Sequence, residues 1–153
     1  MSNKNKKWSQ GEYKLVNPDK YKGTLPVVYR SSWEQRVFYF LDTHPSILEW
    51  GSESIVIPYK SPLDGQIHRY FVDLHFTVKN KNNEIKKYLI EIKPKKQTEP
   101  PKEPKRKTQK ALERYKQEQL EFVKNQAKWE AAKNWAKNKG YVFQIWTEET
   151  LGL

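Results

Sequence analysis

The stretch YLIEIKPKK, residues 88–96, decides how the chain is organised. Its apolar residues are those of a buried strand, and the proline that follows ends it, because proline cannot continue a strand ladder. Successive side chains of a strand point to opposite faces, so Leu89, Glu91 and Lys93 share one face. Charged groups on a buried strand need charged partners. The stretch therefore predicts a core strand that carries polar chemistry at its end.

The preceding residues supply neighbouring strands. HRYFVDLHFTV, residues 68–78, alternates apolar and polar residues with a period of two, which is typical of a strand. The NKNN turn at 80–83 joins it to the strand at 85–93. SIVIPY, residues 54–59, is a further short strand, and an Asp-Gly turn at 64–65 follows it. We expect these three strands to form an antiparallel meander.

Two helices flank the strands. RSSWEQRVFYFLD, residues 30–42, has apolar residues at helical spacing, and Ser31 stands three residues before Glu34, the spacing of a capping box. Residues 108–139 are rich in Ala, Glu, Lys and Gln, and Gly140 supplies a stop signal, which predicts a long helix. A helix of this length exceeds what a small sheet covers, so one end is expected to project.

The last strand candidate is YVFQIW, residues 141–146. A helical crossover separates it from the strand at 85–93, so the two strands are expected to pair in parallel. The order is thus α-β-β-β-α-β, an α/β fold with a mixed central sheet and one long helix. Residues 1–24 are polar and rich in lysine, and we expect a basic flexible arm there, before a single domain over residues 25–153.

The composition limits the classes of function. Lysine and arginine total 29 against 18 acidic residues, a net charge of +11, which favours a polyanionic partner such as nucleic acid. The chain has no cysteine, which excludes disulfides, thiolate catalysis and cysteine-ligated metal centres. No apolar run approaches the roughly 20 residues that span a bilayer, and no signal peptide is recognisable. We therefore expect a soluble protein, made in the cytoplasm and not bound to membranes.

A basic segment leaves the strand at 85–93 directly. Residues 94–107, PKKQTEPPKEPKRK, combine four prolines with six basic residues and are expected to form a semi-rigid loop. Lysine and arginine bind DNA phosphates without reading the base sequence. A phosphate is also expected near the start of the first helix, where Arg30 lies. The predicted DNA-binding residues are Arg30, Lys95, Lys96, Lys102, Lys105, Arg106 and Lys107.

Two carboxylates are predicted to meet. If the strands at 68–78 and 85–93 pair, Asp73 lies close to Glu91, and neighbouring carboxylates repel each other unless a cation lies between them. Oxygen ligands of this kind suit Mg²⁺. An ammonium at Lys93 is then placed to orient, or help deprotonate, a metal-bound water. Phosphodiester hydrolysis requires this combination of metal, nucleophile and cation.

Asp73, followed on the next strand by Glu91-x-Lys93, resembles the PD-(D/E)XK nuclease superfamily, whose restriction-endonuclease-like core has the order α-β-β-β-α-β. Glu34 matches its helical glutamate. The segments YRSSWEQRVFYFLD, FVDLHF, LIEIKPKKQ and FQIWTEETL are similar to endonuclease subunits of heteromeric transposases. The small basic chain more closely resembles the head-completion nucleases of T-even-like tailed phages. The resemblance covers residues 29–150.

The resemblance implies a role for each of these residues. Asp73 and Glu91 would ligate the metal, with the carbonyl of Ile92 as a third ligand. Glu34 would complete the shell, directly or through water. Lys93 would position the attacking water. The implied activity is that of a Mg²⁺-dependent deoxyribonuclease, an endonuclease, for which Mn²⁺ is an expected substitute metal.

The resemblance also implies a setting. It places the chain in phage head completion after DNA packaging, where it would process DNA with little sequence preference. Its partners would be DNA and the portal or neck proteins of the head. Its location would be the host cytoplasm during assembly, and then the head or neck of the virion.

Other interpretations stay open. Glu34 also fits the third helical position of a capping box, and Asp73 fits a polar residue on a solvated strand face. Glu91 and Lys93 also fit a surface charge pair. Val72, rather than proline, precedes Asp73, which weakens the match to the superfamily. For the whole protein, the alternative is a structural head-completion protein that binds DNA ends, or the portal and neck, without turnover. A transposase subunit is disfavoured, because no second domain remains for a partner.

Overall fold

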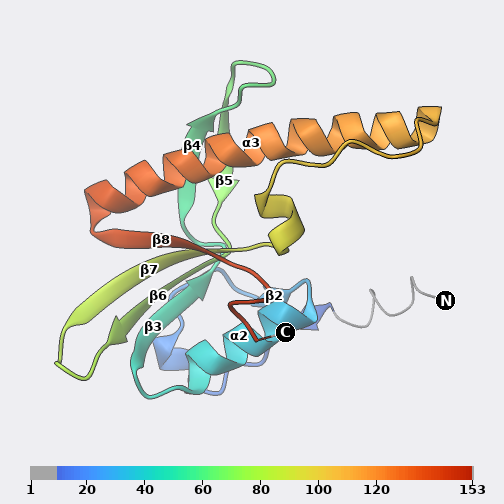
Figure 1. Ribbon diagram of the computed structural model, residues 1–153. Helices are drawn as coiled ribbons and strands as arrows, with labels where there is room; N and C mark the ends of the chain where they lie inside the picture. The colour runs from blue at the N-terminus through green and yellow to red at the C-terminus, as the bar shows by residue number, and fades with distance from the viewer. Residues whose placement is uncertain (1–9, 153) are drawn as a thin grey trace.

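The computed structural model describes residues 10–152 and shows a mixed four-stranded sheet between helices (Figure 1). The strands lie in the order β3-β6-β7-β8. The β3–β6 and β6–β7 pairs are antiparallel, and β7 pairs with β8 in parallel, as predicted. The α/β fold class is therefore confirmed. The strands are β3 Ile47–Ser52, β6 Leu74–Lys79, β7 Ile85–Ile92 and β8 Tyr141–Trp146.

Each face of the sheet has its own hydrophobic core, because adjacent residues of a strand point to opposite sides. Ile90 of β7 packs with Phe38 and Leu41 of helix α2 (Ser32–Thr43). Leu89 packs with Trp129 of helix α3 (Gln109–Lys139) on the other face. All five side chains are buried. A strand covered on both faces reads as a nearly continuous apolar run, which is how β7 was recognisable.

The first strand of the sheet, β3, is absent from the sequence-based prediction, which places the first strand at 54–59. A register shift between Ile47 and Glu49 forms a bulge in β3. As a result Ile47 and Trp50, three residues apart, both join the core on the α2 side. A bulge breaks the alternation of period two by which a strand is recognised. The alternation in this segment is therefore hidden.

Residues 54–59 belong to a separate hairpin, so the predicted three-stranded meander is wrong. Strand β4 (Val56–Lys60) pairs antiparallel with β5 (Ile67–Phe71), and neither strand joins the four-stranded sheet. The order α-β-β-β-α-β still holds for α2-β3-β6-β7-α3-β8, with the β4–β5 hairpin inserted between β3 and β6. The hairpin packs against α3.

The predicted strand at 68–78 is two strands, β5 and β6, with a break at residues 72–73. At the break, the apolar side chains change from one side of the sheet to the other. Tyr70 and Val72 pack on the α3 side, whereas Leu74 and Phe76 pack on the α2 side. The alternation at 68–78 predicts that these four residues share one face of a single strand. This prediction is wrong, because the alternation continues through a break that the pattern does not reveal.

Both helices are confirmed, with their predicted end signals. The Ser31 hydroxyl accepts a hydrogen bond from the Glu34 N–H at 3.1 Å at the start of α2. Thr108 does the same for Ala111 at the start of α3, and Gly140 ends α3 with φ of 78°. The first half of α3 projects past the sheet, as expected (Figure 1). No helix in the described part of the chain is long and apolar enough to cross a membrane.

Residues 10–24 are packed on the domain, so the predicted flexible arm is wrong in this part. The buried Asp42 carboxylate of α2 accepts hydrogen bonds from the Tyr13 hydroxyl at 2.8 Å and from two backbone N–H groups. Tyr21 is buried in the core on the α2 side. The segment is held by single aromatic residues and backbone groups, which leave no apolar pattern in the sequence. The rest of the predicted arm, residues 1–9, lies outside the described residues.

Candidate active site

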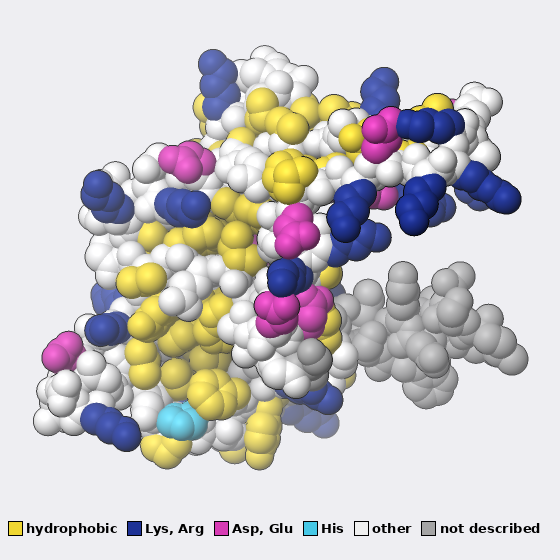
Figure 2. All heavy atoms as spheres, in the orientation of Figure 1, with side chains coloured by type: hydrophobic (Ala, Val, Ile, Leu, Met, Phe, Trp, Pro, Cys, Tyr) yellow, Lys and Arg dark blue, Asp and Glu magenta, His cyan; other side chains and the backbone are white. Residues whose placement is uncertain are grey.

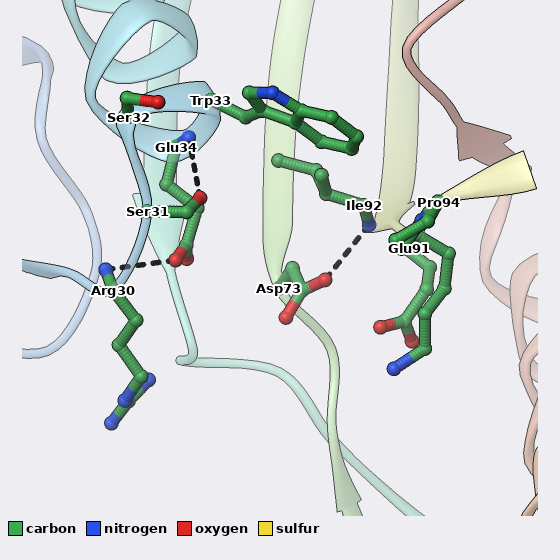
Figure 3. A pocket seen from close by; sticks show the side chains of 10 residues that line it. Arg30, Ser31, Ser32, Trp33, Glu34, Asp73, Glu91, Ile92 and Pro94 are labelled. Atoms are coloured by element: carbon green, nitrogen blue, oxygen red, sulfur yellow. Dashed lines mark hydrogen bonds between the residues drawn. The ribbon is translucent and has the colours of Figure 1, made fainter. Parts of the chain in front are cut away.

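One hollow brings together the four predicted catalytic residues, Glu34, Asp73, Glu91 and Lys93. It has a volume of about 390 Å³ and lies where the start of α2, the break between β5 and β6 and the end of β7 meet. The Asp73 side chain lies between those of Glu34 and Glu91 (Figure 3). Three separate segments of the chain thus build the site. The wall is completed by Arg30, Ser31, Ser32, Trp33, Ile92 and Pro94.

Asp73 lies at the break between β5 and β6. Its carboxylate accepts a hydrogen bond from the Ile92 N–H at 2.8 Å, which ties the start of β6 to the end of β7. Burial raises the pKa of Asp73 to about 6, although this hydrogen bond and the Lys93 ammonium favour the charged form. The second carboxylate oxygen is turned away from Ile92 (Figure 3). Asp73 is therefore half-buried and lines the hollow, which does not fit the interpretation as a polar residue on a solvated strand face.

Glu91 is 6% exposed and lies on the face of β7 that α3 covers. Its carboxylate accepts a hydrogen bond from the Tyr70 hydroxyl. Burial raises the pKa of Glu91 to about 7, and the Lys93 and Lys128 ammonium groups oppose this rise. A carboxylate that is buried to this degree is not half of a surface charge pair, so that interpretation is wrong for Glu91.

Glu34 both caps α2 and faces the hollow. Its carboxylate accepts a hydrogen bond from the Arg30 N–H at 2.9 Å, one residue before the usual capping-box partner. Burial raises the pKa of Glu34, the Arg30 N–H lowers it, and the Asp73 carboxylate raises it again. The capping role and the place in the site thus belong to the same residue.

Lys93 follows the last residue of β7. Its N–H donates to the Trp146 carbonyl at 2.9 Å, which extends the pairing with β8 past the end of the strand. Its ammonium is close enough to lower the pKa of both Asp73 and Glu91. The cation predicted beside the two carboxylates therefore lies beside them.

The residues of the hollow fit a divalent cation. Charge on Asp73 raises the pKa of Glu34, and charge on Glu34 raises that of Glu91, so the carboxylates repel one another. A cation between them would relieve this repulsion. Among residues 10–152, no three acidic or histidine side chains form a ready-made metal cluster. Mg²⁺ does not require one, because it keeps several waters and is bound by one or two carboxylates.

Three of the predicted DNA-binding residues are ion-paired. Each of them is more than half exposed, so its pairing is weak and open to competition from phosphate. One of them, Arg30, also lines the hollow. The pairs are Arg30 with Glu53, Lys95 with Glu149, and Lys107 with Glu103.

The other four lie along the loop before α3. Lys96 and Lys102 line a second hollow, of about 910 Å³, between the loop and α3. Lys105 and Arg106 are exposed and form no ion pair within the described chain. Lysine and arginine side chains gather over the projecting end of α3 and the adjacent loop (Figure 2). The loop begins at Pro94, which lines the active-site hollow, so this positively charged surface starts at the edge of that hollow.

Three residues at the site are absent from the sequence-based prediction. Trp33 forms part of the wall, Glu53 pairs with Arg30, and Tyr70 contacts Glu91. Trp33 directly precedes Glu34, but it matches the apolar periodicity of the helix and is not recognisable as part of a site. No spacing indicates the contacts of Glu53 and Tyr70, because each contact joins residues that are far apart in the sequence. The one available signal is the Tyr70 hydroxyl at a core-facing position, since a buried tyrosine hydroxyl needs a partner.

The fold and the site together define a nuclease core of the PD-(D/E)XK type. Two carboxylates stand at adjoining strand ends, a lysine follows two residues beyond the second, and a glutamate opens the packed helix.

Comparisons with known proteins agree with this class. The sequence matches the family described as TnsA-like endonuclease N terminal over residues 44–148. It is 39% identical over 142 residues to the head completion nuclease of Enterobacteria phage T4, an alignment that covers 92% of each chain. The chain therefore belongs to the TnsA-like endonuclease family. The matched region contains Asp73, Glu91 and Lys93, whereas Glu34 precedes it.

Proposed function

We propose that this chain is a Mg²⁺-dependent deoxyribonuclease, an endonuclease that hydrolyses DNA phosphodiesters with little sequence preference. The observation that carries the proposal is the meeting of Asp73, Glu91 and Lys93 in one hollow, beside a positively charged loop. Clustered, partly or fully buried carboxylates destabilise a metal-free fold, so a purely structural protein has no physical reason to keep them.

The setting of this activity, on the same proposal, is phage head completion. The T4 relative supports it, because that protein is named a head completion nuclease and aligns over nearly the whole chain. The partners are then DNA and the portal or neck proteins of the head. The protein acts in the host cytoplasm during assembly and then in the head or neck of the virion.

The residues of the hollow divide the work of hydrolysis. Asp73, Glu91 and the Ile92 carbonyl hold the cation, and Glu34 completes its shell directly or through water. When bound, Mg²⁺ polarises a phosphoryl oxygen and lowers the pKa of a bound water. Lys93 donates a hydrogen bond to the attacking water and stabilises the negative charge that develops on it. The expected products carry a 5′-phosphate and a 3′-hydroxyl.

Cleavage of plasmid and linear DNA tests this function. The wild-type protein should cut with Mg²⁺ or Mn²⁺, should not cut with EDTA, and should leave ends without a defined sequence. Binding that is salt-sensitive but never accompanied by cleavage would favour the structural alternative. Cleavage at one defined sequence would contradict the expected lack of sequence preference.

Removing Lys105 and Arg106 together, as alanine variants, should weaken binding to every DNA sequence. Each phosphate contact contributes about −0.9 to the slope of log K against log salt, so the slope should become shallower by about two. Fluorescence anisotropy over a salt series measures this slope. The control is Lys137→Ala with Lys139→Ala, which removes the same charge at the other end of α3. An equal change in this control would show that net charge alone, rather than the loop, binds DNA.

Mg²⁺ should raise the melting temperature more at about pH 8 than at about pH 6. The folded-state pKa values of Asp73, about 6, and Glu91, about 7, lie above ordinary values. In the metal-free protein these groups therefore stabilise the fold when protonated, and that contribution is lost as pH rises through 6 and 7. A cation offsets the loss at high pH and competes with protons at low pH.

Thermal unfolding with and without Mg²⁺ at the two pH values measures this difference. The double variant Asp73→Asn with Glu91→Gln should show no Mg²⁺ effect at either pH. Equal shifts in the wild-type protein at both pH values would mean that the cation binds elsewhere.

A further inference from the structure

We propose that the β4–β5 hairpin is part of the active site and that its Tyr70 is a positioning residue for Glu91. The hairpin stands outside the four-stranded sheet, and the chemistry described above does not use it. The inference rests on the proposed function, since it concerns the cation that Glu91 would hold.

The contact between the two side chains carries the inference. The Tyr70 hydroxyl donates to Oε2 of Glu91, and both residues are buried. A hydrogen bond to one carboxylate oxygen fixes the plane of the group and leaves Oε1 for another ligand. Groups that hydrogen-bond a metal ligand in this way orient it and commonly change metal affinity 10–100-fold, as a rough guide.

The Tyr70 ring is itself fixed by its surroundings. It packs with Trp129 and Ala132 of α3, and it lies opposite Ile57 in the β4–β5 ladder. The Lys128 ammonium lies 5.5 Å from the centre of the ring. The packing of the ring between the hairpin and α3 thus fixes the position of the hydroxyl beside Glu91.

A second buried donor does not replace this hydrogen bond. The indole N–H of Trp129 is close enough to Glu91 to favour its charged form, but it is not oriented to form a well-made hydrogen bond with any acceptor in the described chain. Tyr70 is therefore the side chain that sets the orientation of Glu91. Removal of its hydroxyl leaves the carboxylate free to rotate.

The test is Tyr70→Phe, which removes the hydroxyl and keeps the ring that packs on α3 and under Lys128. Calorimetric titration with Mg²⁺ in the absence of DNA should show affinity weakened about 10–100-fold. The Mg²⁺ concentration for half-maximal cleavage should rise by the same factor, with kcat at saturating Mg²⁺ within about threefold of wild type. A merely structural role would lower the melting temperature and leave Mg²⁺ affinity unchanged in the folded protein.

Two matched variants sharpen the result. Tyr59→Phe alters the neighbouring tyrosine of the hairpin, which also lies beneath Lys128 but does not hydrogen-bond Glu91, and should bind Mg²⁺ as wild type does. In a Glu91→Gln background, Tyr70→Phe should add no further loss. Wild-type or tighter Mg²⁺ binding by Tyr70→Phe would overturn the inference.

The outcome also separates this inference from the proposed function. A wild-type protein that binds Mg²⁺ but cuts no DNA would overturn the nuclease activity, and the Mg²⁺ affinities would still decide the role of Tyr70. A wild-type protein that cuts DNA, together with a Tyr70→Phe variant of unchanged affinity, would overturn the inference alone. A wild-type protein that binds no divalent cation would overturn both.

Discussion

Replacing Lys93 by alanine is expected to lower kcat for DNA cleavage by about 10²–10⁴-fold, with little change in the binding of DNA or Mg²⁺. The Lys93 N–H donates to the Trp146 carbonyl at the end of the parallel strand pair, which fixes the backbone from which the ammonium reaches the hollow. No other lysine among residues 10–152 lines the hollow. Single-turnover cleavage at saturating Mg²⁺ measures the chemical step directly.

Lys86→Ala is the matched control for this variant. Lys86 is an exposed lysine of the same strand, far from the hollow, so its loss removes the same charge and should leave the cleavage rate unchanged. Lys93→Arg keeps the charge but replaces a compact ammonium by a planar group, and should recover only a small part of the rate. Wild-type cleavage by Lys93→Ala would remove Lys93 from the mechanism.

Replacing Asp42 by alanine is expected to lower the free energy of unfolding by about 3–5 kcal/mol. The side chain is fully buried and accepts hydrogen bonds from the Tyr13 hydroxyl at 2.8 Å, the Val16 N–H at 2.7 Å and the Asn17 N–H at 3.1 Å. Without the carboxylate these donors lose their acceptor, at about 1–3 kcal/mol for each one that stays buried. Urea denaturation measures the change.

The control is Asp19→Ala, in the same N-terminal segment. Asp19 is exposed and accepts no side-chain hydrogen bond from a buried donor among residues 10–152, so its replacement should change the free energy of unfolding by no more than about 0.5 kcal/mol. If Asp42→Ala is as stable as the wild-type protein, residues 13–17 are not anchored by this carboxylate in solution.

The elements that could be predicted from the sequence are those whose signals are local. Thr108 and Gly140 mark the two ends of α3, and Ser31 marks the start of α2. The core of the site follows from similarly local evidence. The short turn between β6 and β7 sets Leu74 opposite Ile90, which leaves Asp73 and Glu91 as the next residues outward.

The features that could not be predicted depend on contacts between distant segments. The bulge after Ile47 hides the periodicity of β3, and the break at 72–73 lies inside an unbroken alternation. Tyr21 reaches the core as a single residue of a polar segment. The contact of Tyr70 with Glu91 exists only because the hairpin folds back on α3. None of these leaves a pattern within one stretch of sequence.

The β4–β5 hairpin leaves the sheet and returns to it at one point. Ser52 pairs with Leu74, and the Glu53 N–H donates a hydrogen bond to the Asp73 carbonyl at 3.1 Å. In evolutionary terms, the intervening segment can lengthen, shorten or change in sequence while the order of the four strands is inherited intact. If Tyr70 orients Glu91, that same segment sets the affinity for the cation. Substitutions in the β4–β5 hairpin would then change the Mg²⁺ concentration at which the protein works, while every residue of the nuclease core stays the same.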